Sequence, residues 1–363
     1  LSSYLLLLPA ILLISAALSK KIPSLSEFPV FFKKKKNELI FLGFVFIISF
    51  LGTLFAHFYI FYNYPTISDE YVNVFQADIL ASGLLYAPAP PVDDSFKSEF
   101  IINDSGKWYG KYTIGWALLI AAGKILHVEF LVGSLLSALS AVFIYLIGRN
   151  ILDFRAGLIA TVLYVASPYF IFLGGTYFPH TAFGFFMLLA IWALDRTYAE
   201  DNMLYPVIAG LTLGYLPNIR AGDAFVIFVV TLTFVIYSVI KAPGRRSAIL
   251  KTLVIFLFSL VGVGLLLYVN NAQTGSPFLF AFNKYASWDK WGFGVQGHTP
   301  LRGLWNVTYS LMRNCFWTAP LIMPFTFLSA FRRDFKLYFL PVSYTHLRAH
   351  ETPEHLVCRL LLE

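Results

Sequence analysis

Two adjacent carboxylates, Asp69 and Glu70, directly follow a long apolar segment in the stretch T66-I-S-D-E-Y-V-N-V-F-Q-A-D78. A carboxylate in this position can act as a general base on a hydroxyl or an amine, or can bind a metal ion. The same residues also fit a structural role, because Ser68, Asp69 and Glu70 are favourable at the start of a helix. The two roles are compatible, and the residues alone leave both open.

A second polar group follows in the stretch G106-K-W-Y-G-K-Y-T-I-G-W116. Lys111 could neutralise a phosphate, and the hydroxyls of Tyr109 and Tyr112 could donate hydrogen bonds to it. The alternative is an aromatic belt at the membrane surface with lysines that reach towards water. Composition favours the belt, although it does not exclude a phosphate site.

Two further candidates lie at junctions between apolar segments. His180 stands in G174-G-T-Y-F-P-H-T181, which also reads as an ordinary turn. Arg220 is followed by Asp223, and an arginine beside apolar segments needs a partner or access to water. Arg220 could bind a lipid phosphate with two hydrogen bonds, or it could pair internally with Asp223.

The composition places these residues in a membrane protein. Of 363 residues, 58% are hydrophobic, 18% aromatic and only 13% charged, whereas a soluble domain carries about 25% charged residues. The two cysteines exclude a disulfide framework and a cysteine-based metal cluster. We predict no cofactor, although the acid pair is compatible with a divalent metal. The net charge of +7 is attributed to membrane topology and not to nucleic-acid binding.

Apolar segments close to the roughly 20 residues that span a bilayer recur along the chain. The candidate spans are 3–19, 38–62, 128–148, 156–173, 181–195, 204–219, 222–240, 250–270 and 314–331. The segment 113–126 is shorter and contains glycines, so we expect an interfacial helix there.

The distribution of lysine and arginine orients these spans. Basic residues concentrate in alternate junctions, namely 20–37, 149–155, 196–203, 241–251 and 332–336, which we assign to the cytosol. The loops 63–112 and 271–313, and the junctions at 174–180 and at 220, then lie on the other side. All the candidate site residues fall on that side. A transporter usually holds its polar groups at mid-membrane instead.

Several further motifs, in this order, resemble the GT-C superfamily of membrane glycosyltransferases, and they are most similar to bacterial relatives of protein O-mannosyltransferases and of the lipid A aminoarabinose transferase. The resemblance covers about residues 38–335. It is carried by S68-D-E70, F75-Q-A-D-I-L-A-S-G-L-L-Y86, I102-N-D-S-G-K-W-Y-G-K-Y-T-I-G-W-A-L-L119, I144-Y-L-I-G-R149, Ser167-Pro168, Y177-F-P-H-T181, G210-L-T-L-G-Y-L-P-N-I-R220 and N271-A-Q-T-G-S-P-F278. The chain departs from the pattern at Y112-T-I-G115, where many relatives have an aromatic residue followed by Pro-Pro-Gly.

The resemblance implies an all-α polytopic membrane protein, a GT-C-like helix bundle with a long first non-cytosolic loop that carries interfacial helices. It implies an inverting transfer of a hexose or pentose from a polyprenyl-phosphate carrier to a protein, lipid or glycan acceptor. Asp69 and Glu70 would be the catalytic carboxylates. Lys111 and Arg220 would bind the phosphate, and His180 would line the same cavity. A transporter or flippase for a lipid-linked or anionic substrate is the alternative function.

We divide the chain into three parts. Residues 1–37 are expected to form an extra leading helix and a basic cytosolic loop, and residues 38–342 a C-terminally truncated GT-C-like domain. Residues 343–363 interrupt the apolar pattern abruptly, and we interpret them as a non-native tail. The expected location is a bacterial inner membrane, among membrane lipids, with the site on the periplasmic side.

Overall fold

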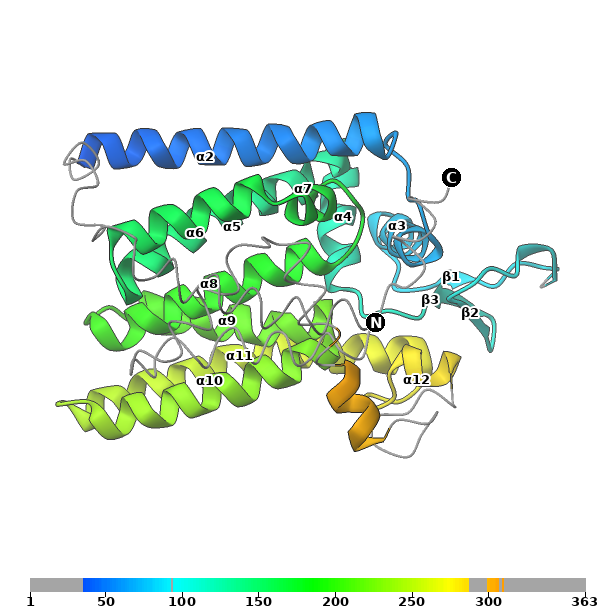
Figure 1. The fold of residues 1–363 in the computed structure, drawn as a ribbon. Coiled ribbons are helices and arrows are strands. Elements are labelled where there is room, and N and C mark those ends of the chain that lie inside the picture. Colours follow the sequence, from blue (N-terminus) through cyan, green and yellow to red (C-terminus); the bar gives the residue numbers. More distant parts are fainter. Residues whose placement is uncertain (1–34, 93, 287–298, 307–308, 310–363) are drawn as a thin grey trace.

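The computed structural model of the protein describes residues 35–92, 94–286, 299–306 and 309. The predicted helix at 3–19, the predicted span at 314–331 and the interpreted tail at 343–363 lie outside these residues. Long helices run side by side through most of the molecule, and a short helix and a small sheet gather at one end of them (Figure 1). We refer to this end as the α3 end of the bundle.

The long helices agree with the predicted spans. Within the described residues, five are long and apolar enough to cross a membrane, or six if one bent pair counts as a span. They are α2 (Lys35–Phe55) continued by the π-helical turn η3 (Ala56–Ile60), α5 (Glu129–Ile151), α8 (His180–Ala199), α10 (Ala221–Lys241) and α11 (Arg245–Thr274). The chain is therefore an integral membrane protein with an all-α polytopic fold, as the sequence predicts.

One predicted span is interrupted. The segment 156–173 forms two helices, α6 (Phe154–Ala166) and α7 (Pro168–Gly174), which meet at an angle of 65°. Ser167 between them is extended, because the residue before a proline is driven out of the helical region. The predicted segment is therefore bent and not one continuous helix, and the break turns α7 towards the α3 end.

Two shorter apolar helices also belong to the described part of the bundle. They are α4 (Gly115–Ile125), close to the short helix expected at 113–126, and α9 (Leu204–Ile219), which has 16 residues. The backbones of α9 and α11 approach closely because both contain glycine. A Cβ atom on Gly262 would lie 2.1 Å from the carbonyl oxygen of Gly214. Asn218 donates a hydrogen bond to Gly262 O at 2.9 Å, which fixes the C-terminal end of α9.

The first predicted outer loop contains more structure than expected. It forms α3 (Ser68–Ala81), the 3₁₀ turn η4 (Asp94–Phe96) and an antiparallel sheet in the order β1 (Ala87–Pro88), β3 (Lys107–Gly110) and β2 (Ile101–Asp104). The sequence analysis did not predict these strands. Their signal is the pair Ser105-Gly106, which has φ values of 53° and 79° and closes a two-residue hairpin.

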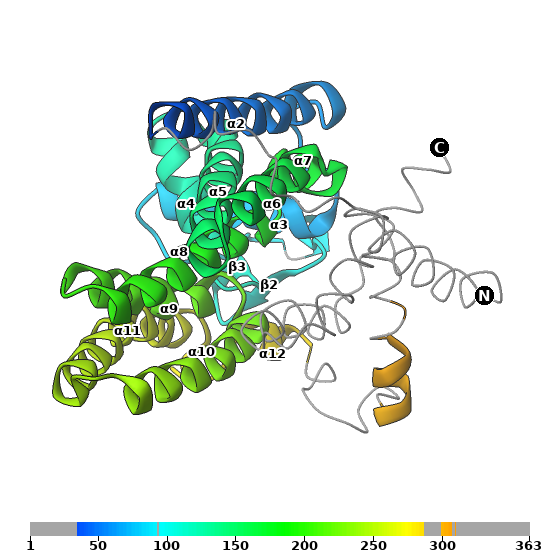
Figure 2. The same ribbon diagram turned by 60° about the vertical axis from the view of Figure 1, so that its left-hand side comes forward.

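The second predicted outer loop lies against this sheet. Its described part includes α12 (Ala281–Tyr285), which lies beside β2 (Figures 1 and 2). Lys107 Nζ donates to Ala272 O at 2.6 Å, and Lys284 forms an ion pair with Asp104. Two segments separated by about half of the chain therefore form one surface at the α3 end.

Candidate active site

Asp69 lies in the first turn of α3 and is in direct contact with Tyr112. The hydroxyl of Tyr112 donates a hydrogen bond to Asp69 Oδ1. The contact forms because α3 lies against the end of β3, where Gly110 N donates to Gln76 Oε1 at 2.9 Å. A Cβ atom on Gly110 would approach Val72 Cγ1 to 2.9 Å, so a larger residue there would force the Val72 side chain or the helix to shift. The structure thus joins two residues that the sequence predicted separately.

Lys111 is held over three aromatic rings. Its Nζ atom lies 3.6 Å from the ring centre of Phe100, 4.8 Å from that of Tyr112 and 5.2 Å from that of Tyr285. Phe100 and Tyr112 belong to the first outer loop, and Tyr285 belongs to α12. Cation–π contacts of this kind stabilise a positive charge. The ammonium group of Lys111 is therefore fixed beside the Tyr112–Asp69 pair.

Glu70 has a different environment from Asp69. Its side chain is fully buried and accepts hydrogen bonds from Thr66 Oγ1 at 2.6 Å and from the backbone N–H of Tyr177 at 2.8 Å. Burial raises the pKa of the Glu70 carboxyl, and these hydrogen bonds offset part of that effect. No side chain caps the start of α3 at Ile67. Glu70 therefore fixes α3 to the loop between α7 and α8, which is a supporting role.

The loop between α7 and α8 connects several parts of this end of the bundle. Tyr177 O accepts a hydrogen bond from Trp116 Nε1 at 2.6 Å. Gly175 O lies 2.7 Å from His57 Nδ1, and the other ring nitrogen of His57 lies 2.7 Å from Asn63 Oδ1. His57 is buried in the π-helical turn η3 and was missed by the sequence analysis. The sequence did contain a signal for His57, because an ionisable residue near the end of an apolar span indicates a functional role.

His180 and Arg220 form a second polar group with Asp223. Arg220 Nε donates to Asp223, and Arg220 Nη1 lies 2.9 Å from His180 Nε2. A guanidinium group can only donate, so His180 Nε2 accepts and the ring proton lies on Nδ1. The buried Nδ1 atom has no hydrogen-bond partner in the part of the chain that the structure describes. The internal pair Arg220–Asp223, one of the two alternatives from the sequence, is present.

The two polar groups are connected through the backbone. Thr113 Oγ1 donates to Ile219 O at 3.1 Å, and this carbonyl belongs to the peptide bond that leads into Arg220. A Cβ atom on Gly115 would lie 2.6 Å from the backbone of Asn218, so this glycine permits the approach. The residues after Lys111 and Tyr112 therefore run directly against the end of α9 that carries Arg220.

Tyr109 does not join these groups. It is fully buried in β3 and packs in a separate cluster with Ile102 and Ala281. Burial raises the pKa of its phenol to about 12, and its hydroxyl has no hydrogen-bond partner among the described residues. The arrangement gives Tyr109 a packing role, whereas Tyr112 faces Asp69.

Within the residues that the structure describes, no group of three or more His, Cys, Asp or Glu side chains could hold a metal ion. That this protein works without a metal or other cofactor stays a prediction.

The model of the dolichyl-phosphate-mannose-protein mannosyltransferase family matches residues 109–289. This match, over just under half of the chain, supports a glycosyltransferase of the GT-C superfamily. The matched range includes Lys111, Tyr112, His180 and Arg220, whereas Asp69 precedes it. No curated protein matches the sequence.

One solved structure supports the fold, and a second is less similar. The apo oligosaccharyltransferase of Archaeoglobus fulgidus superposes with a TM-score of 0.50 and 14% identity, over 87% of this chain and 50% of that enzyme. The oligosaccharyltransferase AglB of the same organism, in complex with an inhibitory peptide and a dolichol-phosphate, gives a TM-score of 0.47 and 18% identity, over 83% and 39%. This chain thus spans about half the length of the first of these enzymes. The family match favours a transferase over the transporter that the sequence left as an alternative.

Proposed function

We propose that the protein transfers a sugar from a polyprenyl-phosphate carrier to an acceptor hydroxyl or amine, with Asp69 as the general base. The matching family is named for a dolichyl-phosphate-linked sugar donor, which supports a lipid-phosphate donor. The observation that carries the proposal is the contact between Asp69 and Tyr112 with Lys111 beside it. A base and a positive charge next to each other are what this chemistry requires.

The proton transfer is assigned to one oxygen of Asp69. Tyr112 donates to Oδ1, and no described residue donates to Oδ2. In the reaction, the acceptor oxygen or nitrogen forms a bond to the anomeric carbon while its proton passes to Asp69. The bond between that carbon and the phosphate oxygen breaks, and its electron pair leaves with the phosphate. Attack opposite the leaving group inverts the anomeric configuration.

The leaving phosphate needs positive charge, which Lys111 and Arg220 would supply. Lys111 is held in place by its rings, and Arg220 is held by Asp223 and His180. Donors that are fixed before the reaction stabilise developing charge without reorganisation. His180 orients Arg220 in this scheme. Glu70 positions α3, and Tyr112 positions the Asp69 carboxylate.

The acceptor and the location complete the proposal. A protein, lipid or glycan acceptor would approach from the α3 end, which we place on the periplasmic side of a bacterial inner membrane. The alternation of basic junctions supports this orientation. At the opposite end, Arg149 pairs with Glu38, and Lys251 donates to Glu200 O at 2.7 Å, so basic residues gather there.

A donor assay tests the proposal. Membranes that contain the full-length protein are incubated with a labelled polyprenyl-phosphate hexose or pentose, and membranes from the host without the protein are the control. We expect label in the acceptor fraction, with the anomeric configuration inverted relative to the donor by NMR. Transfer from a nucleotide sugar without any lipid-linked intermediate would contradict the proposal.

A further inference from the structure

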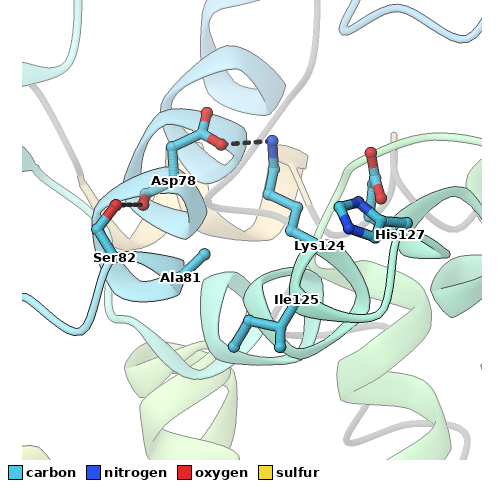
Figure 3. Close-up of a pocket in the computed structure, with 7 residues that line it drawn as sticks. Asp78, Ala81, Ser82, Lys124, Ile125 and His127 are labelled. Atoms are coloured by element: carbon cyan, nitrogen blue, oxygen red, sulfur yellow. Dashed lines mark hydrogen bonds and ion pairs between the residues drawn. The ribbon is translucent and has the colours of Figure 1, made fainter.

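A separate pocket lies where the C-terminal ends of α3 and α4 meet the start of α5 (Figure 3). Its volume is about 460 Å³, within the range of about 300–1,000 Å³ that is usual for ligand pockets. Its charged lining consists of Asp78, Lys124, His127 and Glu129. Asp78 follows Asp69 by roughly 14 Å along α3, at about 1.5 Å per residue. The pocket therefore contributes nothing to the chemistry proposed above.

The local sequence explains why these side chains meet. The backbone turns back after α4, where His127 has a left-handed φ of 56° and Val128 N donates to Gly123 O at 2.8 Å. A Cβ atom on Gly123 would lie 2.7 Å from the Cα atom of Glu129, so this glycine allows α5 to begin beside the end of α4. The turn brings Glu129 next to the residues at the end of α4.

The pocket presents both signs of charge. Lys124 Nζ lies 2.6 Å from Asp78 Oδ1, and this ion pair joins α4 to α3. The side chain of Asp78 is 60% exposed, which leaves it accessible from the pocket. Glu129 is half-buried, and no hydrogen bond or ion pair joins it to any residue that the structure describes. A half-buried carboxylate without a hydrogen bond or an ion pair to the described residues favours a cationic ligand group.

Apolar side chains border the pocket. Ile125 and Leu126 are 63% and 70% exposed, and adjacent exposed apolar side chains of this size can contact a membrane. Glu129 is the first residue of α5, one of the helices long enough to span a membrane. The pocket thus lies at the boundary where a spanning helix begins, with polar groups inside it and apolar groups beside it.

We propose that this pocket binds the headgroup of a phospholipid with a primary amine, of the phosphoethanolamine type. The ammonium group contacts Glu129 and Asp78, and the phosphate contacts Lys124 and His127. The acyl chains lie along Ile125 and Leu126. Both charges of the headgroup are matched, and the apolar border explains a lipid better than a soluble molecule. A basic peptide would use the carboxylates but would leave Lys124 and the apolar border without a function.

Lipid binding to the delipidated full-length protein tests this site, because it is independent of sugar transfer. Phosphatidylethanolamine, phosphatidylcholine and phosphatidylglycerol are titrated separately and followed by native mass spectrometry. We expect phosphatidylethanolamine to bind at least about tenfold more tightly than the other two. The quaternary amine of choline cannot donate hydrogen bonds, and phosphatidylglycerol has no amine.

Variants locate the binding. Glu129→Gln keeps the shape of the side chain and should weaken phosphatidylethanolamine binding about tenfold, and Lys124→Met should have a similar effect. Asp201→Asn, at a side chain that is 96% exposed at the other end of the bundle, and Lys97→Met are the matched controls and should bind as the wild type does. Equal affinity for the three lipids, or wild-type binding by Glu129→Gln, would overturn the proposal. Binding of a basic peptide or of soluble phosphoethanolamine without binding of the lipid would also overturn it.

Discussion

The hydroxyl of Tyr112 donates a hydrogen bond to Asp69 Oδ1, across 43 residues of sequence. The contact depends on α3 lying against the end of β3, and Lys111 is stacked on the ring of the same tyrosine. Tyr112 thus fixes one carboxylate oxygen and holds the cation beside it. The proposed base and the proposed phosphate ligand are therefore parts of one unit.

Tyr112→Phe removes the hydrogen bond but keeps the ring beneath Lys111. A hydrogen bond to a charged group contributes about 1.5–3 kcal/mol, so we expect turnover to fall roughly ten- to a hundredfold. Steady-state kinetics with the lipid-linked donor measures this change. Tyr109→Phe is the matched control, since it removes a buried hydroxyl without a partner among the described residues. It should keep turnover within about twofold and raise stability by up to about 1 kcal/mol. Equal losses in the two variants would contradict the distinction between the tyrosines.

Glu70 should make stability depend on pH. Burial raises the pKa of Glu70 in the folded state above the ordinary 4.5. At a pH between the pKa of the unfolded state and the raised pKa of the folded state, the folded protein therefore binds more protons than the unfolded protein. This contribution to stability is present in full below about pH 4.5 and is lost as the pH rises through the raised pKa. Glu70→Gln should remove the dependence, and thermal unfolding across this pH range measures it.

Glu70→Ala is the companion variant. It leaves the backbone N–H of Tyr177 and the hydroxyl of Thr66 without their acceptor, which should cost about 2–3 kcal/mol at every pH. If Glu70→Gln were as destabilising as Glu70→Ala at high pH, the ionised carboxylate would be essential and the burial argument would be wrong.

Arg220→Lys should weaken donor binding. Arg220 contacts both Asp223 and His180, and the single ammonium group of lysine cannot reproduce that planar geometry. We expect KM for the lipid-linked donor to rise about tenfold, with a smaller effect on kcat. Arg196→Lys is the control. Arg196 forms an ion pair with Glu200 at the end of α8 that lies away from His180, so this variant should leave both constants unchanged. An unchanged KM for Arg220→Lys would remove Arg220 from the phosphate site.

Much of the helical framework could be predicted from the sequence. Apolar length and the placement of basic residues located α5, α8, α10 and α11 closely, because these signals are local to each span. The break at Ser167 was readable from the proline that follows it, but apolar length alone concealed it.

The partners within the site could not be predicted in the same way. Nothing local distinguishes Tyr109 from Tyr112, because burial in β3 and contact with Asp69 both depend on the tertiary arrangement. The ring of Tyr285 reaches Lys111 from a distant segment, and no spacing in the sequence indicates that contact. The acid pair separated into two roles only when Glu70 proved to be buried.

The ion pair between Asp104 and Lys284 should hold the two outer segments together. Hydrogen bonding to Lys284 lowers the pKa of the Asp104 carboxyl, so its contribution to stability is present above the ordinary value of 3.8 and is lost as the pH falls. Both side chains are partly exposed, and we expect a coupling energy of only about 0.5–1 kcal/mol. A double-mutant cycle with Asp104→Asn and Lys284→Met measures it at pH 7 and pH 3. A coupling that grows at the lower pH would contradict the assignment.

Turnover by Asp69→Asn tests the central claim most directly. The full-length variant is inserted into membranes and assayed with the labelled polyprenyl-phosphate sugar, and its thermal unfolding is compared with that of the wild type. Because general-base catalysis contributes about 10²–10⁴-fold, we predict a loss of that size in kcat with unchanged insertion and stability. Wild-type turnover by Asp69→Asn would show that Asp69 is not the base.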